Sequence, residues 1–221
     1  MSAESGTRSS DSPGSATGVV LAGGGSTRFG DDDKAMALLG GQSLVGRAVA
    51  AQRAATGGPV LVAGGNDEKC DRLSATVDAE PTAFVTDAPG YEGPLAGLVA
   101  AARATAARAV VATGCDMPLV APRAVAWLVR VAQRHLGRAD AVIPVDDEGR
   151  AQPLLGVYDA GFAANPPVDG NVGLRALLDA GETRYVSPDE VPDSVPLARS
   201  WTNVNTREEL AELRERDVRS A

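Results

Sequence analysis

The chain has few of the residues that build the commonest catalytic and metal sites. Among 221 residues there is one histidine, His135, and there are two cysteines, Cys70 and Cys115. So small a set excludes a zinc centre of the usual kind, and it excludes a Ser–His or Cys–His nucleophile pair. We expect His135 to be exposed and inert, and the two cysteines to be free thiols.

Long apolar runs are also missing. No stretch approaches the roughly 20 residues that are needed to cross a bilayer. The first residues, MSAESGTRSSDSPGSATG, are rich in serine and glycine and contain no apolar core of a secretory signal. We therefore expect a disordered leader over residues 1–17, a single folded domain over residues 18–221, and a cytoplasmic location.

Positive charge is scarce, and lysine is the scarcest form of it. The formal net charge is −8, and no basic stripe is present, which argues against a nucleic-acid partner. An anionic ligand must then be attracted by local positive charge or by a metal. Arginine supplies 19 of the 21 basic residues, so lysine occurs only at Lys34 and Lys69. Lys34 lies inside a glycine-rich motif, where a compact ammonium differs chemically from a guanidinium.

Aromatic residues make up only 4% of the chain, so its core must be built from Ala, Val and Leu. Apolar runs that predict buried parallel strands alternate with helical segments. The strands are expected at 18–22, 59–63, 82–86, 109–113 and 140–145, and the helices at 43–55, 94–107 and 122–136. This alternation predicts the α/β class: a single doubly wound, mostly parallel sheet with helices on both faces.

The pattern is less regular after residue 150. A strand over 152–158, a helix over 172–180 and a strand over 184–187 precede a Pro/Asp-rich loop. Thr206 stands three residues before Glu209, which predicts a capping box on a final amphipathic helix.

Ligands of open α/β sheets bind at the carboxyl ends of the strands. The segments that follow the first four strands read GGGSTRFGDDDK, GGNDEK, DAPGYEGPLAG and GCDMP. Glycines, prolines and carboxylates therefore gather at these ends, and this convergence is stronger evidence than any one motif.

The glycines of the first segment let backbone N–H groups approach a phosphate closely. Arg28 and Lys34 would neutralise phosphate charge. The segment is not a P-loop, because Asp31 stands where that motif requires a lysine. The alternative is a surface turn whose two cations are merely solvated.

Asp116 follows a buried strand, where a carboxylate is well placed to bind a hard cation such as Mg²⁺. The alternative is a turn or N-cap aspartate before Pro118, and Asp87 has the same two interpretations. The run at 31–33 is more typical of a solvated loop. The helix that begins near Pro94 offers its N-terminus to an anion or a base, or simply starts a helix.

Together these segments resemble a known family. LAGGGSTRFGDDDK (21–34) resembles the signature of nucleotidyltransferases with a Rossmann-like fold. GPLAGL (93–98), CDMP (115–118), QPLLGVY (152–158) and NVNTREEL (203–210) resemble, in order, further motifs of the molybdenum cofactor guanylyltransferase family. The resemblance covers most of the chain from residue 18 onward.

The resemblance implies an Mg²⁺-dependent transfer of GMP from GTP to the terminal phosphate of molybdopterin, with release of pyrophosphate. GTP and molybdopterin are then the small-molecule partners, and molybdoenzymes or other cofactor-biosynthesis proteins are possible protein partners. Related cytidylyltransferases carry L-A-A-G where this chain has L-A-G-G, so Gly23 favours the larger guanine. The implied nucleotide-binding residues are Leu21, Ala22, Gly23, Gly24, Lys34, Asn66 and Asp87. The implied catalytic residues are Arg28, Lys34 and Asp116, with Asp116 as the Mg²⁺ ligand.

Two alternatives stay open. One is a transferase that acts on another phosphorylated acceptor, such as a sugar phosphate or phospholactate, or that transfers CMP to molybdopterin. The other is a non-catalytic nucleotide-binding module. Arg28, Lys34 and Asp116 weigh against the second, because a sensor does not need a metal ligand beside its phosphate cations.

Overall fold

The structure is a computed structural model that describes residues 16–23, 33–77, 82–168 and 172–219. Its centre is a seven-stranded sheet in the order β5-β4-β1-β6-β8-β7-β9, and a two-stranded ladder joins β2 to β3. The strands are β1 (Ala16–Leu21), β2 (Leu38–Leu39), β3 (Gln42–Ser43), β4 (Val60–Ala63), β5 (Thr82–Val85), β6 (Ala109–Gly114), β7 (Ala141–Pro144), β8 (Leu155–Asp159) and β9 (Thr183–Val186). The leader expected over 1–17 lies largely outside the described residues, and β1 begins two residues before the expected start.

The mostly parallel sheet expected from the sequence is confirmed. β1 pairs in parallel with β4 and β6, β4 with β5, and β7 with β9. β8 is the exception, because it runs antiparallel to both β6 and β7. This inserted strand explains why the regular strand–helix alternation is lost in the second half of the sequence.

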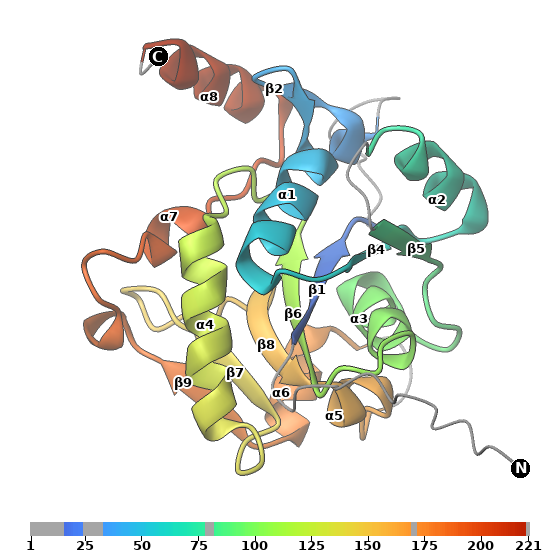
Figure 1. Ribbon diagram of the computed structural model, residues 1–221, viewed down its shortest axis with the longest axis vertical. Helices are drawn as coiled ribbons and strands as arrows, with labels where there is room; N and C mark the ends of the chain where they lie inside the picture. The colour runs from blue at the N-terminus through green and yellow to red at the C-terminus, as the bar shows by residue number, and fades with distance from the viewer. Residues whose placement is uncertain (1–15, 24–32, 78–81, 169–171, 220–221) are drawn as a thin grey trace, which may run out of the picture.

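Helices cover both faces of the sheet (Figure 1). They are α1 (Leu44–Thr56), α2 (Asp67–Ser74), α3 (Gly93–Arg103), α4 (Pro122–His135), α5 (Ala160–Ala164), α6 (Leu174–Ala180), α7 (Leu197–Ser200) and α8 (Arg207–Arg219), with short 3-10 turns η1 (Lys34–Met36) and η2 (Pro188–Glu190). In the described part of the chain, no helix is long and apolar enough to span a membrane.

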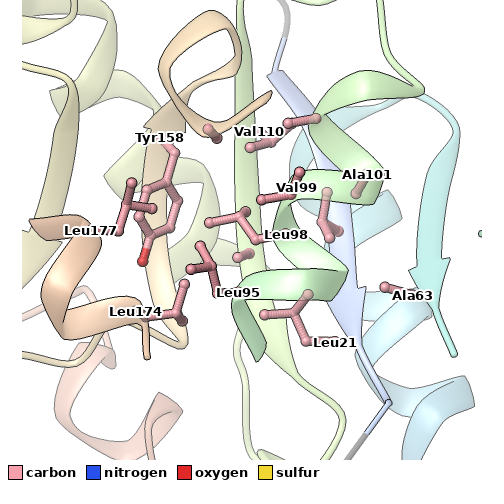
Figure 2. Packing of buried hydrophobic residues seen from close by; sticks show 14 of the residues in the cluster. Leu21, Ala63, Leu95, Leu98, Val99, Ala101, Val110, Tyr158, Leu174 and Leu177 are labelled. Carbon is pink, nitrogen blue, oxygen red and sulfur yellow. The ribbon is translucent and has the colours of Figure 1, made fainter. Parts of the chain in front are cut away.

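Alternate residues of each strand point to opposite faces of the sheet and so pack against different helix layers, because side chains alternate along a strand with a period of two. Val19 packs in the cluster with α3, α5 and α6, whereas the next residue, Val20, packs in the cluster with α1 and α2. Figure 2 shows Leu95 and Leu98 of α3 in the first of these layers, between Tyr158 of β8 and Leu21 of β1. The end of β1 is thus held by fully packed apolar groups.

Local sequence explains where the main helices begin and end. The Ser43 hydroxyl accepts a hydrogen bond from the Gly46 backbone N–H (3.1 Å), and Gly57 ends α1 in the left-handed conformation (φ 71°). α3 stops at Arg103, four residues before its expected end. There the Thr105 hydroxyl accepts from the Ala107 N–H (3.1 Å), and this turn competes with the helix.

Four elements were not expected from the sequence: the β2–β3 hairpin, α2, α5 and α7. α2 was missed because its segment is polar and buries only Cys70 and Leu73, one turn apart. The two hairpin strands have two residues each, which is too short for any alternation to show.

The last helix, α8, is anchored away from the sheet, beside β2 (Figure 1). Its predicted capping box is confirmed. The Thr206 hydroxyl accepts from the Glu209 N–H (3.1 Å), and the Glu209 carboxylate accepts from the Thr206 N–H (3.2 Å). Leu210 is buried with Leu39 and Val204.

Candidate active site

A cleft opens where the carboxyl ends of β4, β1 and β6 lie level. Leu21 pairs with Ala63 of β4 and with Gly114 of β6, the last residues of all three strands. From β1 the chain moves outward to β4 and β5 and then returns to β6 on the other side, so this is the topological switch point of the sheet. The cleft has a volume of about 130 Å³ and is lined by Leu21, Ala22, Gly23, Asp33, Lys34, Ala35, Ala63, Asp87, Gly93, Pro94, Gly97, Gly114, Cys115, Asp116 and Leu154.

An ion pair crosses this cleft. Lys34 Nζ of η1 lies 2.9 Å from Asp116 Oδ2, and the two side chains are only 16% and 18% exposed. The ammonium also donates to Asn205 Oδ1 (3.3 Å), from the segment that precedes α8. The Val204 N–H donates to the Asp116 carbonyl (2.8 Å), so the C-terminal segment is tied to both partners of the pair.

The second oxygen of Asp116 is exceptional. Oδ1 is buried and has no hydrogen-bond partner in the described part of the chain. It lies close to the backbone of Gly114, where a Cβ atom would come within 2.4 Å of it. A buried, unpartnered carboxylate oxygen is costly, and such groups call for a ligand or ion.

A second ion pair lies beside the first. Lys69 Nζ of α2 is 3.1 Å from Asp33 Oδ2, with exposures of 12% and 10%. The other Asp33 oxygen, Oδ1, accepts from the Ala35 N–H (3.0 Å) and so caps η1. Asp33 and Lys34 are neighbours in the chain, so the two ion pairs lie next to each other.

Asp87 is held among glycines on the opposite side of the cleft. A Cβ atom at Gly23 would lie 2.9 Å from Asp87 Oδ2, and one at Gly97 would lie 3.3 Å from Oδ1. Oδ1 is buried and has no hydrogen-bond partner within residues 16–23, 33–77, 82–168 and 172–219. Burial raises the pKa of Asp87 above its ordinary 3.8, and a hydrogen bond from the Gly65 backbone and the charge of Lys69 oppose this rise.

Cys115 lines the cleft but is not a plausible nucleophile. Burial raises the pKa of its thiol to about 12, and the neighbouring charge of Asp116 adds to the effect. A thiol that stays protonated at neutral pH does not attack phosphorus. Cys70 and Cys115 are both free and buried, as expected.

Asp116 fits a magnesium ligand on the chemistry of its surroundings. Mg²⁺ prefers hard oxygen donors and is usually bound by one or two carboxylates together with substrate phosphates. The unpartnered Oδ1 supplies one such donor. No group of three or more His, Cys, Asp or Glu side chains that could hold a metal was found in the described ranges. The oxygens of a bound phosphate would supply further ligands of the kind that Mg²⁺ prefers.

The structure brings six of the sequence-predicted residues into this one cleft: Leu21, Ala22, Gly23, Lys34, Asp87 and Asp116. Asn66 is not among the lining residues. It is exposed, and its Oδ1 accepts from the Lys69 N–H (2.9 Å) as the N-cap of α2. Gly24 and Arg28 lie outside the described residues.

Three site residues were missed: Asp33, Lys69 and Asn205. The rarity of lysine had drawn attention to Lys34, and the same reasoning applied to Lys69 would have found it. Asp33 had been discounted with the 31–33 run as solvated, yet its side chain is 10% exposed. Sequence reasoning does not pair Asp33 with Lys69, because their contact depends on how α2 packs beside η1.

A glycine-lined cleft at the switch point of a parallel sheet, with a lysine and an aspartate across it, is the kind of site that binds nucleotide phosphates. Comparison with known proteins identifies the class of protein as a nucleotidyltransferase. Residues 18–186 match the model of the MobA-like NTP transferase domain, and the chain belongs to this family.

Similar proteins carry consistent names. A probable molybdenum cofactor guanylyltransferase of Bacillus cytotoxicus is 29% identical over 203 residues, which cover 90% of this chain and 96% of that protein. One from Bacillus cereus is 31% identical over 202 residues, covering 88% and 94%. The crystal structure of molybdopterin-guanine dinucleotide biosynthesis protein A from Archaeoglobus fulgidus has the same fold, with a TM-score of 0.76 at 23% identity over 92% of this chain and 99% of that one.

Proposed function

We propose that this chain transfers GMP from GTP to the terminal phosphate of molybdopterin and releases pyrophosphate. The observation that carries the proposal is the Lys34–Asp116 pair. One carboxylate oxygen holds the lysine, and the other is buried and has no hydrogen-bond partner among the described residues. A purely structural ion pair would not need a second, unpartnered carboxylate oxygen, whereas a cation bound to a phosphate would use that oxygen as a ligand. The names of the similar proteins supply the acceptor and the base.

In phosphoryl and nucleotidyl transfer a protein acts mainly by aligning the two phosphates and by neutralising the charge that develops between them. Lys34 is placed to bind the nucleotide phosphates, and the backbone of Leu21 to Gly23 lies where it can approach them closely. Arg28 would add a second cation. Asp116 would hold Mg²⁺, which neutralises phosphate charge when it is bound.

Recognition of guanine is assigned to Asp87. The guanine edge presents two adjacent donors, N1–H and the N2 amino group, which together match one carboxylate. Cytosine presents a single amino donor beside acceptors, and these repel a carboxylate. The sequence-based view was that the missing methyl of Gly23 makes room for a purine. In the folded chain the nearest atoms to that methyl would be the Asp87 carboxylate oxygens, so Gly23 acts by leaving Asp87 in place.

The direct test is to incubate the protein with Mg²⁺ and each of the four NTPs, with and without molybdopterin, and to measure pyrophosphate. We expect release with GTP only, and only when molybdopterin is present. Release with CTP alone would contradict the guanine assignment. Release with GTP and a sugar phosphate, but not with molybdopterin, would contradict the assignment of molybdopterin as the acceptor.

The cytoplasmic location stays a prediction.

A further inference from the structure

Lys69 occupies an unfavourable place for a cation. It lies in the first turn of α2, where the partial positive charge of the helix N-terminus favours acidic groups, and Asp67 and Glu68 precede it. The chain contains only one other lysine, and that residue is in the cleft. A cation that is only 12% exposed at a helix N-terminus needs compensation, and Asp33 supplies a negative charge 3.1 Å away.

Asp33 connects this lysine to the cleft. Its Oδ2 is 3.1 Å from Lys69, and its Oδ1 accepts from the Ala35 N–H at 3.0 Å. Its carbonyl accepts from the Met36 N–H, also at 3.0 Å. One side chain therefore joins α2 to the start of η1, and the next residue along the chain is Lys34.

We propose that Lys69 is a positioning residue that, through Asp33, fixes η1 so that Lys34 is held opposite Asp116. The proposal rests on the proposed function for its catalytic consequence. Its structural part stands on the two contacts of Asp33 and on the burial of the pair. A surface ion pair would contribute little, but Lys69 and Asp33 are almost excluded from water.

Two independent pieces of geometry favour positioning over direct phosphate binding. Lys69 is not among the residues that line the cleft, whereas Asp33 is. Both Asp33 oxygens already have protein partners, Lys69 and the Ala35 N–H, so the carboxylate ties η1 in place. The charge of Lys69 also lowers the pKa of Asp87, which helps to keep that carboxylate ionised.

The test compares Lys69→Met with Lys69→Arg, and uses Arg72→Gln as a control that removes one exposed positive charge from the same helix. Because Lys69→Met leaves Asp33 buried and unpaired, the double variant Lys69→Met/Asp33→Asn is included to keep a folded protein in the series. Two quantities are measured: hydrogen exchange at the amides of residues 35–37, and the kcat and KM for GTP in transfer to molybdopterin.

We expect the amides of residues 35–37 to exchange about tenfold faster in Lys69→Met and in the double variant, while those of α1 keep their protection. We expect kcat to fall on the order of 10- to 100-fold, with KM for GTP changed by less than about threefold, as for a misplaced catalytic group. The amide exchange rates and the kcat of Lys69→Arg should be closer to those of the wild type than to those of Lys69→Met. Arg72→Gln should match the wild type in both measurements.

Unchanged exchange at residues 35–37 in Lys69→Met would overturn the proposal. So would a large rise in KM with kcat preserved, because it would mean that Lys69 binds the nucleotide itself. If the wild type transfers no GMP to molybdopterin, the proposed function fails. The exchange measurement still decides whether Lys69 positions η1, so the two failures are distinguishable.

Discussion

At the scale of single residues, the cleft contains two buried carboxylate oxygens, Asp87 Oδ1 and Asp116 Oδ1, for which the described part of the chain offers no hydrogen-bond partner. Each lies against a glycine that leaves no room for a methyl group. Burial of unsatisfied acceptors lowers the free energy of unfolding. A folded chain retains them where a ligand completes their bonding, and the two glycines keep both carboxylates correctly placed.

Gly114→Ala tests this placement. The added Cβ would meet Asp116 Oδ1 at 2.4 Å, and that atom is the free end of a flexible side chain. The carboxylate should therefore rotate away at a stability cost of only about 1 kcal/mol. We expect kcat to fall on the order of 100-fold, as for a displaced catalytic group. The measurements are steady-state kinetics and urea unfolding.

Gly58→Ala is the matched control, because a Cβ atom there would have no heavy atom within 4 Å. Its turnover should equal that of the wild type. The idea that Gly114 orients Asp116 fails if Gly114→Ala retains wild-type kcat.

Asp87 gives a prediction for stability against pH. Its folded-state pKa lies above the ordinary 3.8, mainly through burial. In the window between 3.8 and the raised value, the folded chain holds a proton that the unfolded chain has released. Stability contributed by the protonated group is therefore lost as pH rises through this window. We expect Asp87→Asn to be more stable than the wild type at pH 7, with the difference shrinking on acidification.

Urea unfolding at a series of pH values measures this difference. Asp146→Asn should show the opposite sign. The pKa of Asp146 is lowered, first by a hydrogen bond from the Arg150 backbone N–H, so its contribution is present at neutral pH and lost in acid. A difference for Asp87→Asn that is constant with pH would mean that burial of the charged form is not its cause.

At the scale of elements, α8 anchors the segment that reaches Lys34 and Asp116. Leu210 is 3% exposed and packs with Leu39, Leu44 and Val204. The Arg214 guanidinium donates to the Leu38 carbonyl at 2.6 Å. Helix α8 and the β2–β3 hairpin therefore form one unit, and Asn205 is carried by it.

Leu210→Ala should lower the free energy of unfolding by about 2–4 kcal/mol, because it opens a cavity in this small cluster. Urea unfolding measures it. The control is Leu38→Ala on the hairpin, where the side chain is 52% exposed and the change should stay within about 0.5 kcal/mol. An equal decrease in the free energy of unfolding in the two variants would show that α8 is not held by its apolar contacts.

The elements that the sequence predicted well are those with a strong local signal. Runs such as GVVLA and AVVAT are apolar at nearly every position, which predicts strands buried on both faces, and Ser43 and Pro122 marked the helix starts. The hairpin carried no such signal. A strand was expected at 152–158, which overlaps β8, but its direction was not predicted. The antiparallel direction of β8 depends on pairing between segments more than 40 residues apart, such as Ala109 with Asp159.

The site could be predicted as far as it depends on strand ends. Gly23 and Asp116 lie in segments that the rule for ligands at the carboxyl ends of parallel strands singles out, whereas Leu21 was implied only by the family resemblance. Asp33 and Lys69 could not be paired from the sequence, because their contact depends on how α2 packs beside η1. The side-chain oxygen of Asn66 caps α2, and its role in nucleotide binding stays a prediction.

At the scale of the whole molecule, the proposed function requires a chain with a net charge of −8 to bind two polyanionic substrates. Among the described residues, the fold gathers both lysines of the chain at one edge of the sheet. This local charge, together with a bound cation, would offset the repulsion of the overall field. The doubly wound sheet makes such concentration possible because the carboxyl ends of its central strands end at the same level.

The most direct test of the central claim is to follow the α-phosphate of GTP. Wild-type protein and Asp116→Asn are incubated with Mg²⁺, molybdopterin and GTP labelled at the α-phosphorus. The wild type should place the label in a pterin dinucleotide and leave the pyrophosphate unlabelled. Asp116→Asn should stay folded and transfer label at least about 100-fold more slowly. Transfer by Asp116→Asn at the wild-type rate, or label found in GDP instead of the pterin product, would contradict the account.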